Sequence, residues 1–202
     1  VTDVVARNTF SNDELLRLAG SIEKGSEHSL AEAIVKTAEA KHLALSNVEK
    51  FQAIPGHGVQ GVVDGKGILF GNKRLMDTKG VDVSDAEKQI SEMEDGGKTV
   101  MMLSVDGKLA GLIAVADIVK ETAQDGIAAL RKLGIEVVMI TGDNQRTAQA
   151  IGRSLGIGRI LAGVLPHQKE AEVRKVQAEG KKVAMVGDGI NDAPALAAAD
   201  VG

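Results

Sequence analysis

The first half of the chain mixes helical repeats with short apolar runs that are separated by turn residues. Apolar residues at helical spacing follow Ser11, Ser29 and Ser84, and each serine has a Glu three residues later, the spacing of a capping box. Asp-Gly pairs at residues 64–65 and 106–107 each separate two apolar runs, as in a β-hairpin. The pattern predicts an α+β region with an antiparallel sheet and flanking helices.

After Asp117 the pattern changes to a strict alternation of helical and strand-like segments. The expected helices are residues 120–133, 145–155 and 167–179, and the expected strands are residues 136–140, 159–162 and 182–186. A glycine separates each helix from the strand after it. Such alternation predicts a parallel sheet with helices on both faces. We therefore expect two domains that meet between Gly107 and Asp117.

Composition excludes several classes of protein. The 202 residues carry a net charge of −4 with 1% aromatic residues and neither Trp nor Tyr, whereas nucleic-acid binding usually requires a basic face or stacking aromatics. The absence of Cys excludes disulfides and thiolate metal sites. No apolar run is long enough to span a bilayer, and the start has no signal-peptide pattern. We expect a soluble segment that binds no nucleic acid.

An acidic string follows the last expected strand. Residues 187–192 read Gly-Asp-Gly-Ile-Asn-Asp, which places Asp188 and Asp192 after the strand with Asn191 between them. Mg²⁺ prefers oxygen ligands, and ligands of open α/β sheets bind at the carboxyl ends of the strands. A simple Asp-Gly turn is the alternative for Asp188 alone. For the whole string we expect Asp188 and Asp192 to bind Mg²⁺.

Two further polar segments stand before expected helices. Thr141, Gly142 and Asp143 follow the strand at 136–140, where a hydroxyl and helix-start amides can hold a phosphoryl oxygen. Asp143 or Asn144 would equally serve as an ordinary helix cap. Lys169 opens the helix at 167–179, and an isolated lysine there would be ordinary surface charge.

These three segments, taken together, resemble the motifs of haloacid-dehalogenase-type phosphotransferases in the form found in P-type ATPases. The resemblance implies a haloacid-dehalogenase-like, Rossmann-type parallel sheet that carries an inserted α+β nucleotide-binding domain. It implies phosphoryl chemistry with Mg²⁺ as cofactor. The catalytic residues implied by the resemblance are Thr141, Gly142, Asp143, Lys169 and Asn191.

The first half resembles the nucleotide-binding domain of heavy-metal P-type ATPases. Residues 26–31, Ser-Glu-His-Ser-Leu-Ala, match a Ser-Glu-His-Pro-Leu-Ala motif, with Ser29 in place of Pro. The resemblance implies an ATP site formed by Glu27, His28, Gly56, Gly58 and Gly71.

Each of these residues also has a plain structural interpretation, as a polar helix lead-in or a glycine-rich bulge. Residues 56–61 form a G-x-G-x-x-G string, but a strand follows it, so a dinucleotide fold is excluded. No aromatic platform for a base is evident from the sequence.

The resemblance further implies an ATP-driven pump for a heavy-metal ion, with wording closest to the copper type. Residues 1–9 would link to the phosphorylation domain, 10–108 would form the nucleotide-binding domain, and 109–202 an incomplete phosphorylation domain. ATP and the pump's actuator and transmembrane domains are the implied partners, at the cytoplasmic face of a membrane. Without Cys, no site for the transported ion is expected here.

The family's nucleophile is the Asp of an Asp-Lys-Thr-Gly-Thr motif, which does not occur in the sequence. We therefore expect the chain to begin just after that motif and to be inactive alone. The alternative is a soluble phosphatase of the same superfamily, with residues 10–108 as a cap. It too requires a nucleophilic Asp, and it leaves Glu27, His28, Gly56 and Gly58 unexplained.

Overall fold

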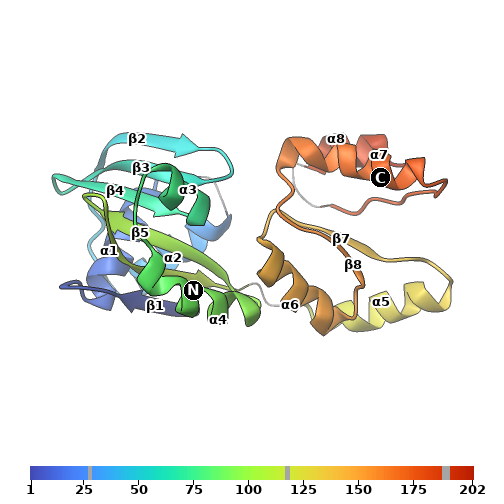
Figure 1. Cartoon of the computed structure of the whole chain (residues 1–202), viewed down its shortest axis with the longest axis horizontal. Helices are drawn as coiled ribbons and strands as arrows, with labels where there is room; N and C mark the ends of the chain where they lie inside the picture. Colours follow the sequence, from blue (N-terminus) through green and yellow to red (C-terminus); the bar gives the residue numbers. More distant parts are fainter. Residues whose placement is uncertain (27–28, 117–118, 188–191) are drawn as a thin grey trace. The chain divides into compact units, whose positions relative to one another are not determined.

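The computed structural model describes residues 1–26, 29–116, 119–187 and 192–202. The chain divides into two compact units, Val1–Ile118 and Val119–Gly202. Figure 1 shows the first unit in blue to green and the second in yellow to red. We describe each unit separately.

The first unit is built on a six-stranded antiparallel sheet with the order β1-β6-β5-β4-β3-β2. Its strands are β1 (Asp3–Ala6), β2 (Val48–Ile54), β3 (Gly58–Val63), β4 (Lys66–Gly71), β5 (Thr99–Val105) and β6 (Lys108–Val115). The predicted hairpins are confirmed, because Asp64-Gly65 joins β3 to β4 and Asp106-Gly107 joins β5 to β6. All four turn residues have φ between 48° and 79°, as a two-residue turn that matches the strand twist requires.

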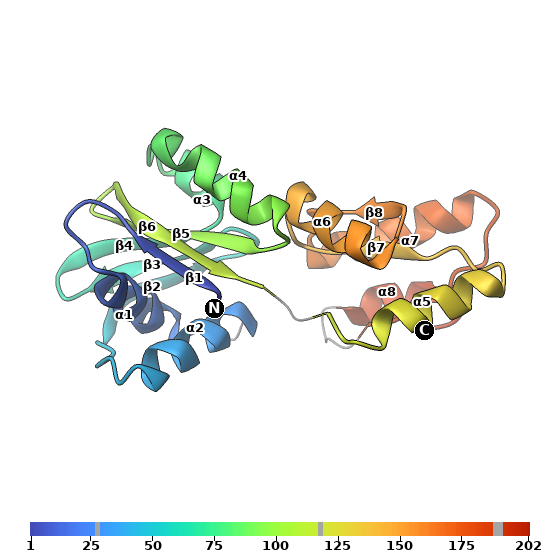
Figure 2. The same cartoon turned by 90° about the horizontal axis from the view of Figure 1, so that it is seen from below.

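Helices cover both faces of this sheet, as Figure 2 shows. The helices are α1 (Asn12–Glu23), α2 (Ser29–Ala40), α3 (Lys73–Thr78) and α4 (Glu87–Asp95), the last preceded by the 3₁₀ turn η1 (Ser84–Ala86). A first core lies between the sheet and α1 and α2, with Leu15, Ile34 and Phe70 among its buried residues. A second core lies on the side of α3 and α4 and includes Met76 and Met102.

The capping boxes have different outcomes. The box at Ser11 is confirmed, because Ser11 Oγ accepts from Glu14 N at 3.2 Å and Glu14 Oε2 accepts from Ser11 N at 2.9 Å. The box at Ser84 is wrong: α4 begins at Glu87, after η1, and the Glu87 carboxylate pairs with Lys73 instead. The predicted box at Ser29 stays a prediction, because the Ser29 side chain is not among those that the structure describes.

β1 and all of β6 after Lys108 lie outside residues 10–108, which the sequence assigned to the first domain. β1 lies within the expected linker, 1–9, and pairs with β6 from Asp3↔Ala114 to Ala6↔Gly111. β6 also pairs with β5, so residues 109–115 belong to the sheet of the first unit. Pairing between strands so distant in sequence leaves no mark in the local hydrophobic pattern. The assignment of residues 10–108 to nucleotide binding and of residues 109–202 to phosphorylation stays a prediction.

The second unit has the predicted alternation, with a shorter sheet. Its elements are α5 (Ala123–Lys132), β7 (Val138–Ile140), α6 (Gln145–Leu155), β8 (Arg159–Leu161), η2 (Pro166–Gln168), α7 (Lys169–Ala178) and α8 (Ala193–Ala198). β7 and β8 are parallel, and Gly156 ends α6 in the left-handed conformation with φ 68°.

The strand expected at 182–186 does not form. Ala184 makes a single parallel bridge to Val201, and no neighbouring strand extends it along the described residues. Strand structure requires a partner ladder, which an apolar run alone cannot supply. Among the residues described, no helix combines the length and the apolar character needed to cross a membrane.

Candidate functional site

The glycine turn between β2 and β3 is held against the end of β4. Gly58 pairs directly with Gly71 across the strands. A Cβ on Gly58 would stand 2.2 Å from Phe70 O, and one on Gly71 would stand 2.2 Å from His57 O. Gly58 also has φ 144° and Gly56 has φ 73°, a backbone region that favours glycine. The two strands therefore approach more closely at this point than any side chain permits.

Asn72 fixes the same turn from the start of α3. Its Nδ2 donates to Gly56 O at 2.8 Å, and its backbone N donates to His57 O at 2.9 Å. Its Oδ1 accepts from Leu75 N at 3.1 Å, which caps α3. Asn72 was not among the predicted site residues, although its position before a short helical segment is typical of a cap.

Of the predicted nucleotide-site residues, Glu27 and His28 lie outside the described residues. Nearby in sequence, Glu23 ends α1 and is only 5% exposed. Its Oε2 has no hydrogen-bond partner among the described residues. Burial raises the pKa of Glu23, and a hydrogen bond from the Ser26 side chain opposes this increase. A buried carboxyl oxygen without a partner is rare enough to suggest a binding role.

Glu23 was not among the site residues predicted from the sequence. The available signal was an acidic residue in the last turn of α1, where the helix dipole disfavours a negative charge.

Thr141 and Asp143 form one compact group after β7. Thr141 Oγ1 donates to Asp143 Oδ2 at 2.7 Å and accepts from Asp143 N at 3.1 Å. Gly163 N donates to Asp143 O at 2.7 Å, and Val164 N donates to Thr141 O at 3.0 Å. These bonds join the loop after β7 to the loop after β8, so the carboxyl ends of the two parallel strands are tied together.

The cap of α6 is Asn144. Its Oδ1 accepts from Arg146 N at 3.0 Å and from Thr147 N at 3.1 Å. The alternative of an ordinary helix cap by Asp143 or Asn144 is therefore confirmed for Asn144, whereas the Asp143 carboxylate bonds to Thr141. Gly142 lies between the two groups, and a Cβ there would meet Val164 O only at an ordinary 3.6 Å.

Lys169 and Asp192 form a second group. Lys169 Nζ lies 2.6 Å from Asp192 Oδ1, and the two side chains are only 19% and 11% exposed. Lys169 is the first residue of α7, and Asp192 immediately precedes α8. A Cβ on Gly187 would stand 2.8 Å from Asp192 Oδ2, so glycine at 187 leaves room for this carboxylate. Lys169 is therefore held in place rather than being free surface charge.

The expected metal ligands are only partly described. Asp188 and Asn191 lie outside the described residues, and Asp192 pairs with Lys169. Within the described ranges, no group of three or more His, Asp or Glu side chains is placed to hold a metal ion. Carboxylate oxygens at strand ends are nevertheless the donor type that Mg²⁺ prefers, and Mg²⁺ takes few ligands from protein.

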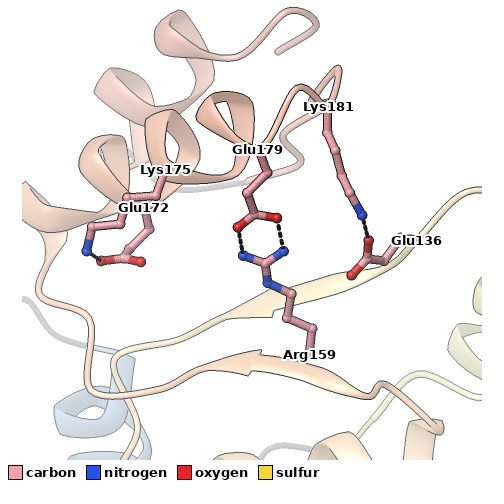
Figure 3. Close-up of polar contacts among 6 residues, drawn as sticks. All are labelled: Glu136, Arg159, Glu172, Lys175, Glu179 and Lys181. Carbon is pink, nitrogen blue, oxygen red and sulfur yellow. Dashed lines mark hydrogen bonds and ion pairs between the residues drawn. The ribbon is translucent and has the colours of Figure 1, made fainter.

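Ion pairs brace the opposite end of β8, as Figure 3 shows. Arg159 Nη1 and Nη2 donate to the two oxygens of Glu179 at 2.7 and 2.5 Å, and this pairing lowers the pKa of Glu179. Lys181 pairs with Glu136 before β7. Each exposed pair contributes little to stability alone, but the fork of Arg159 fixes the end of α7 against β8.

Replacing Gly71 with Ala tests the close approach of β3 and β4. The added Cβ would meet backbone at 2.2 Å, so we expect the free energy of unfolding to fall by about 1–3 kcal/mol. Gly67→Ala on the same strand is the control. Only Asp106 Oδ1, at 3.4 Å, would meet its Cβ, and we expect a change of less than about 0.5 kcal/mol. Urea unfolding followed by circular dichroism measures both, and equal stabilities would contradict the interpretation.

The buried carboxyl of Glu23 predicts a pH dependence of stability. The unfolded chain releases this proton near the ordinary pKa of 4.5, whereas the folded chain keeps it to higher pH. The folded state then binds more protons, so stability decreases as pH rises through the raised pKa. We expect Glu23→Gln to remove this decrease. Urea unfolding of both proteins between about pH 4 and pH 8 measures the effect, and parallel curves would show that Glu23 is ionised normally.

Comparison with known proteins places this geometry in a family. The profile of the haloacid dehalogenase-like hydrolases matches residues 1–200. The copper-exporting P-type ATPase of Bacillus subtilis is 47% identical over all 202 residues, which cover 25% of its length. Copper-transporting ATPase 2 of Rhizobium meliloti is 48% identical over 202 residues, or 24% of its length. The chain thus spans about a quarter of these relatives.

Solved structures show the same fold. The catalytic domain of a CPx-ATPase matches 98% of this chain and 69% of its own, with a TM-score of 0.69 and 25% identity. A zinc-transporting PIB-type ATPase matches 98% of this chain and 32% of its own, with a TM-score of 0.63 and 37% identity. The predicted fold class is confirmed. With the profile match over almost every residue, the chain belongs to the haloacid dehalogenase-like hydrolase family.

Proposed function

We propose that the chain is the ATP-binding and phosphorylation region of a P-type ATPase that moves a copper ion across a membrane. The observation that carries the proposal is the similarity of all 202 residues to copper-exporting P-type ATPases at 47% identity. In such a pump, ATP hydrolysis through an aspartyl-phosphate drives the transport. The region would lie at the cytoplasmic face, with the actuator and transmembrane domains as its partners.

The second unit would provide the phosphoryl site. The Thr141 hydroxyl and the backbone at Gly142 would hold a phosphoryl oxygen, with Asp143 fixing the hydroxyl through its 2.7 Å bond. Lys169 would neutralise phosphoryl charge, and Asp192 holds its ammonium group at 2.6 Å. We therefore assign the positioning of Lys169 to Asp192, and metal binding to Asp188 with Asn191 beside it. Mg²⁺ would supply charge neutralisation at the phosphoryl oxygens.

The attacking group is not among these residues. Phosphoryl transfer by this mechanism needs a carboxylate in line with the γ-phosphate. The first candidate by position, Asp3, lies on β1 and pairs with Lys98 at 2.7 Å in the first unit. We propose that an aspartate outside the 202 residues is the nucleophile, so that this chain alone does not turn over ATP.

The first unit would bind the nucleotide. Glu27 and His28 would contact the base, and the glycine turn at Gly56 and Gly58 would accommodate the nucleotide against bare backbone. Gly71 keeps that turn close to β4. We add Glu23, since its buried carboxyl has an oxygen without a partner among the described residues and precedes Glu27 and His28 by a few residues in the sequence.

Nucleotide titration tests the base contact. We expect the chain to bind a non-hydrolysable ATP analogue with modest affinity, and His28→Ala to weaken binding about tenfold, the effect of roughly 1.4 kcal/mol. His42→Asn is the matched control. His42 is exposed after α2 and has φ 57°, a conformation that Asn tolerates. The His42→Asn variant should therefore bind the analogue like the native chain. Calorimetric titration with unchanged affinity for His28→Ala would remove His28 from the site.

Phosphorylation of the complete pump tests the metal site. We expect Asp188→Asn to lower Mg²⁺-dependent labelling by γ-labelled ATP by about 100-fold or more, because the carboxylate is needed at the phosphoryl group. ATP binding to the first unit should persist. Asp125→Asn, on the exposed side of α5, is the control and should label normally. A normal acyl-phosphate in Asp188→Asn would show that Asp188 is not the essential ligand.

A further inference from the structure

The edge strand β2 contains an irregularity that turns one aromatic side chain. Its pairing with β3 shifts between Glu49 and Gln52, and Lys50 has φ 52°, a left-handed conformation that costs energy outside glycine. Irregularities of this kind re-aim a side chain and are common beside active sites. Phe51 is the residue in the middle.

The packing of the two ends of β2 confirms that the alternation of its side chains between the two sheet faces is interrupted at this irregularity. Val48 packs against the first core, whereas Ile54 packs against the second core on the opposite face of the sheet. They are six positions apart, an even number, so both would lie on the same face of a regular strand. The irregularity therefore places Phe51 on the face of α1 and α2. Its ring carbons Cε1 and Cζ lie 3.9 Å from the position of a Cβ on Gly25, just after α1.

Phe51 differs from the other aromatic residues. The chain has three Phe and neither Trp nor Tyr. Phe70 is completely buried, and Phe10 packs against the first core with Lys66 Nζ 5.6 Å from its ring centre. Phe51, in contrast, is 38% exposed. It is the most exposed of the three Phe residues, since Phe10 is only partly exposed.

Three small residues lie near Phe51. Gly61 is opposite on β3, and a Cβ there would lie 3.5 Å from Phe51 Cα. Ala53, two residues further along β2, is exposed. Gly25 lies against the edge of the ring. None of these three residues carries a side chain larger than a methyl group that could cover the ring.

We propose that Phe51 is the platform on which the base of the bound nucleotide stacks. This rests on the proposed ATP binding by the first unit. The ring lies against Gly25, and Gly25 precedes in sequence the segment that carries the proposed base contacts. Along β2, about 10 Å separates residue 51 from residue 54, beyond which the glycine turn begins. One strand thus connects the base platform to the turn proposed for the rest of the nucleotide.

Calorimetric titration of the native chain and Phe51→Ala with ATP and with tripolyphosphate tests the platform. Loss of one stacking ring should weaken ATP binding by about 5- to 100-fold and leave tripolyphosphate binding unchanged. The matched control is Gln52→Ala. Gln52 is exposed on the same strand and bonds to Gln60 at 2.7 Å, away from the platform. It should bind ATP like the native chain.

Phe51→Trp adds a direct reporter, because the native chain has no Trp. We expect its fluorescence to change on addition of ATP and not on addition of tripolyphosphate. Equal ATP affinity of the native chain and Phe51→Ala, or a silent indole, would overturn the platform while leaving the proposed function intact. A native chain that binds no ATP would overturn both.

Discussion

Backbone segments in both candidate sites lie closer to their neighbours than a side chain would allow. Gly58 and Gly71 face each other across β3 and β4, and a Cβ on either would meet a carbonyl oxygen at 2.2 Å. In the second unit, a Cβ on Gly187 would meet Asp192 Oδ2 at 2.8 Å. In the first unit the absent side chains let the turn before β3 lie against the end of β4. In the second unit the absent side chain at residue 187 leaves room for the Asp192 carboxylate. Glycine therefore has a packing role in these sites, in addition to any contact with a ligand.

The two units differ in how their buried ionisable side chains are paired. Lys169 and Asp192 are both mostly buried, and each compensates the other, so neither charge is left unpaired away from water. Glu23 is buried without such a cation, and burial raises the pKa of its carboxyl. A fixed positive charge suits a phosphoryl group, whereas a buried carboxyl with an unpaired oxygen suits hydrogen bonding to a base. The difference in pairing thus matches the difference in the proposed ligands.

Local signals made much of the fold predictable from the sequence. Asp-Gly turns at 64–65 and 106–107 located two hairpins, and Ser11 with Glu14 located the start of α1, because these features depend on residues close in sequence. The pairing of β1 with β6 depends on distant residues and could not be seen. Phe51 was overlooked for a related reason: only the irregular pairing at Lys50 turns its ring toward Gly25.

The expected strand at 182–186 failed for a physical reason. Parallel sheets are normally covered on both faces, yet the residues of β7 are all partly exposed and α5 buries none of its apolar residues. Val186 is 92% exposed directly before the acidic string. The apolar run at 182–186 and the helix α5 are both present. What is lacking among the described residues is a surface against which they would pack. The short sheet β7–β8 and the single bridge at Ala184 therefore have the same physical cause, because neither has enough packed neighbours among the described residues to extend the strand pairing.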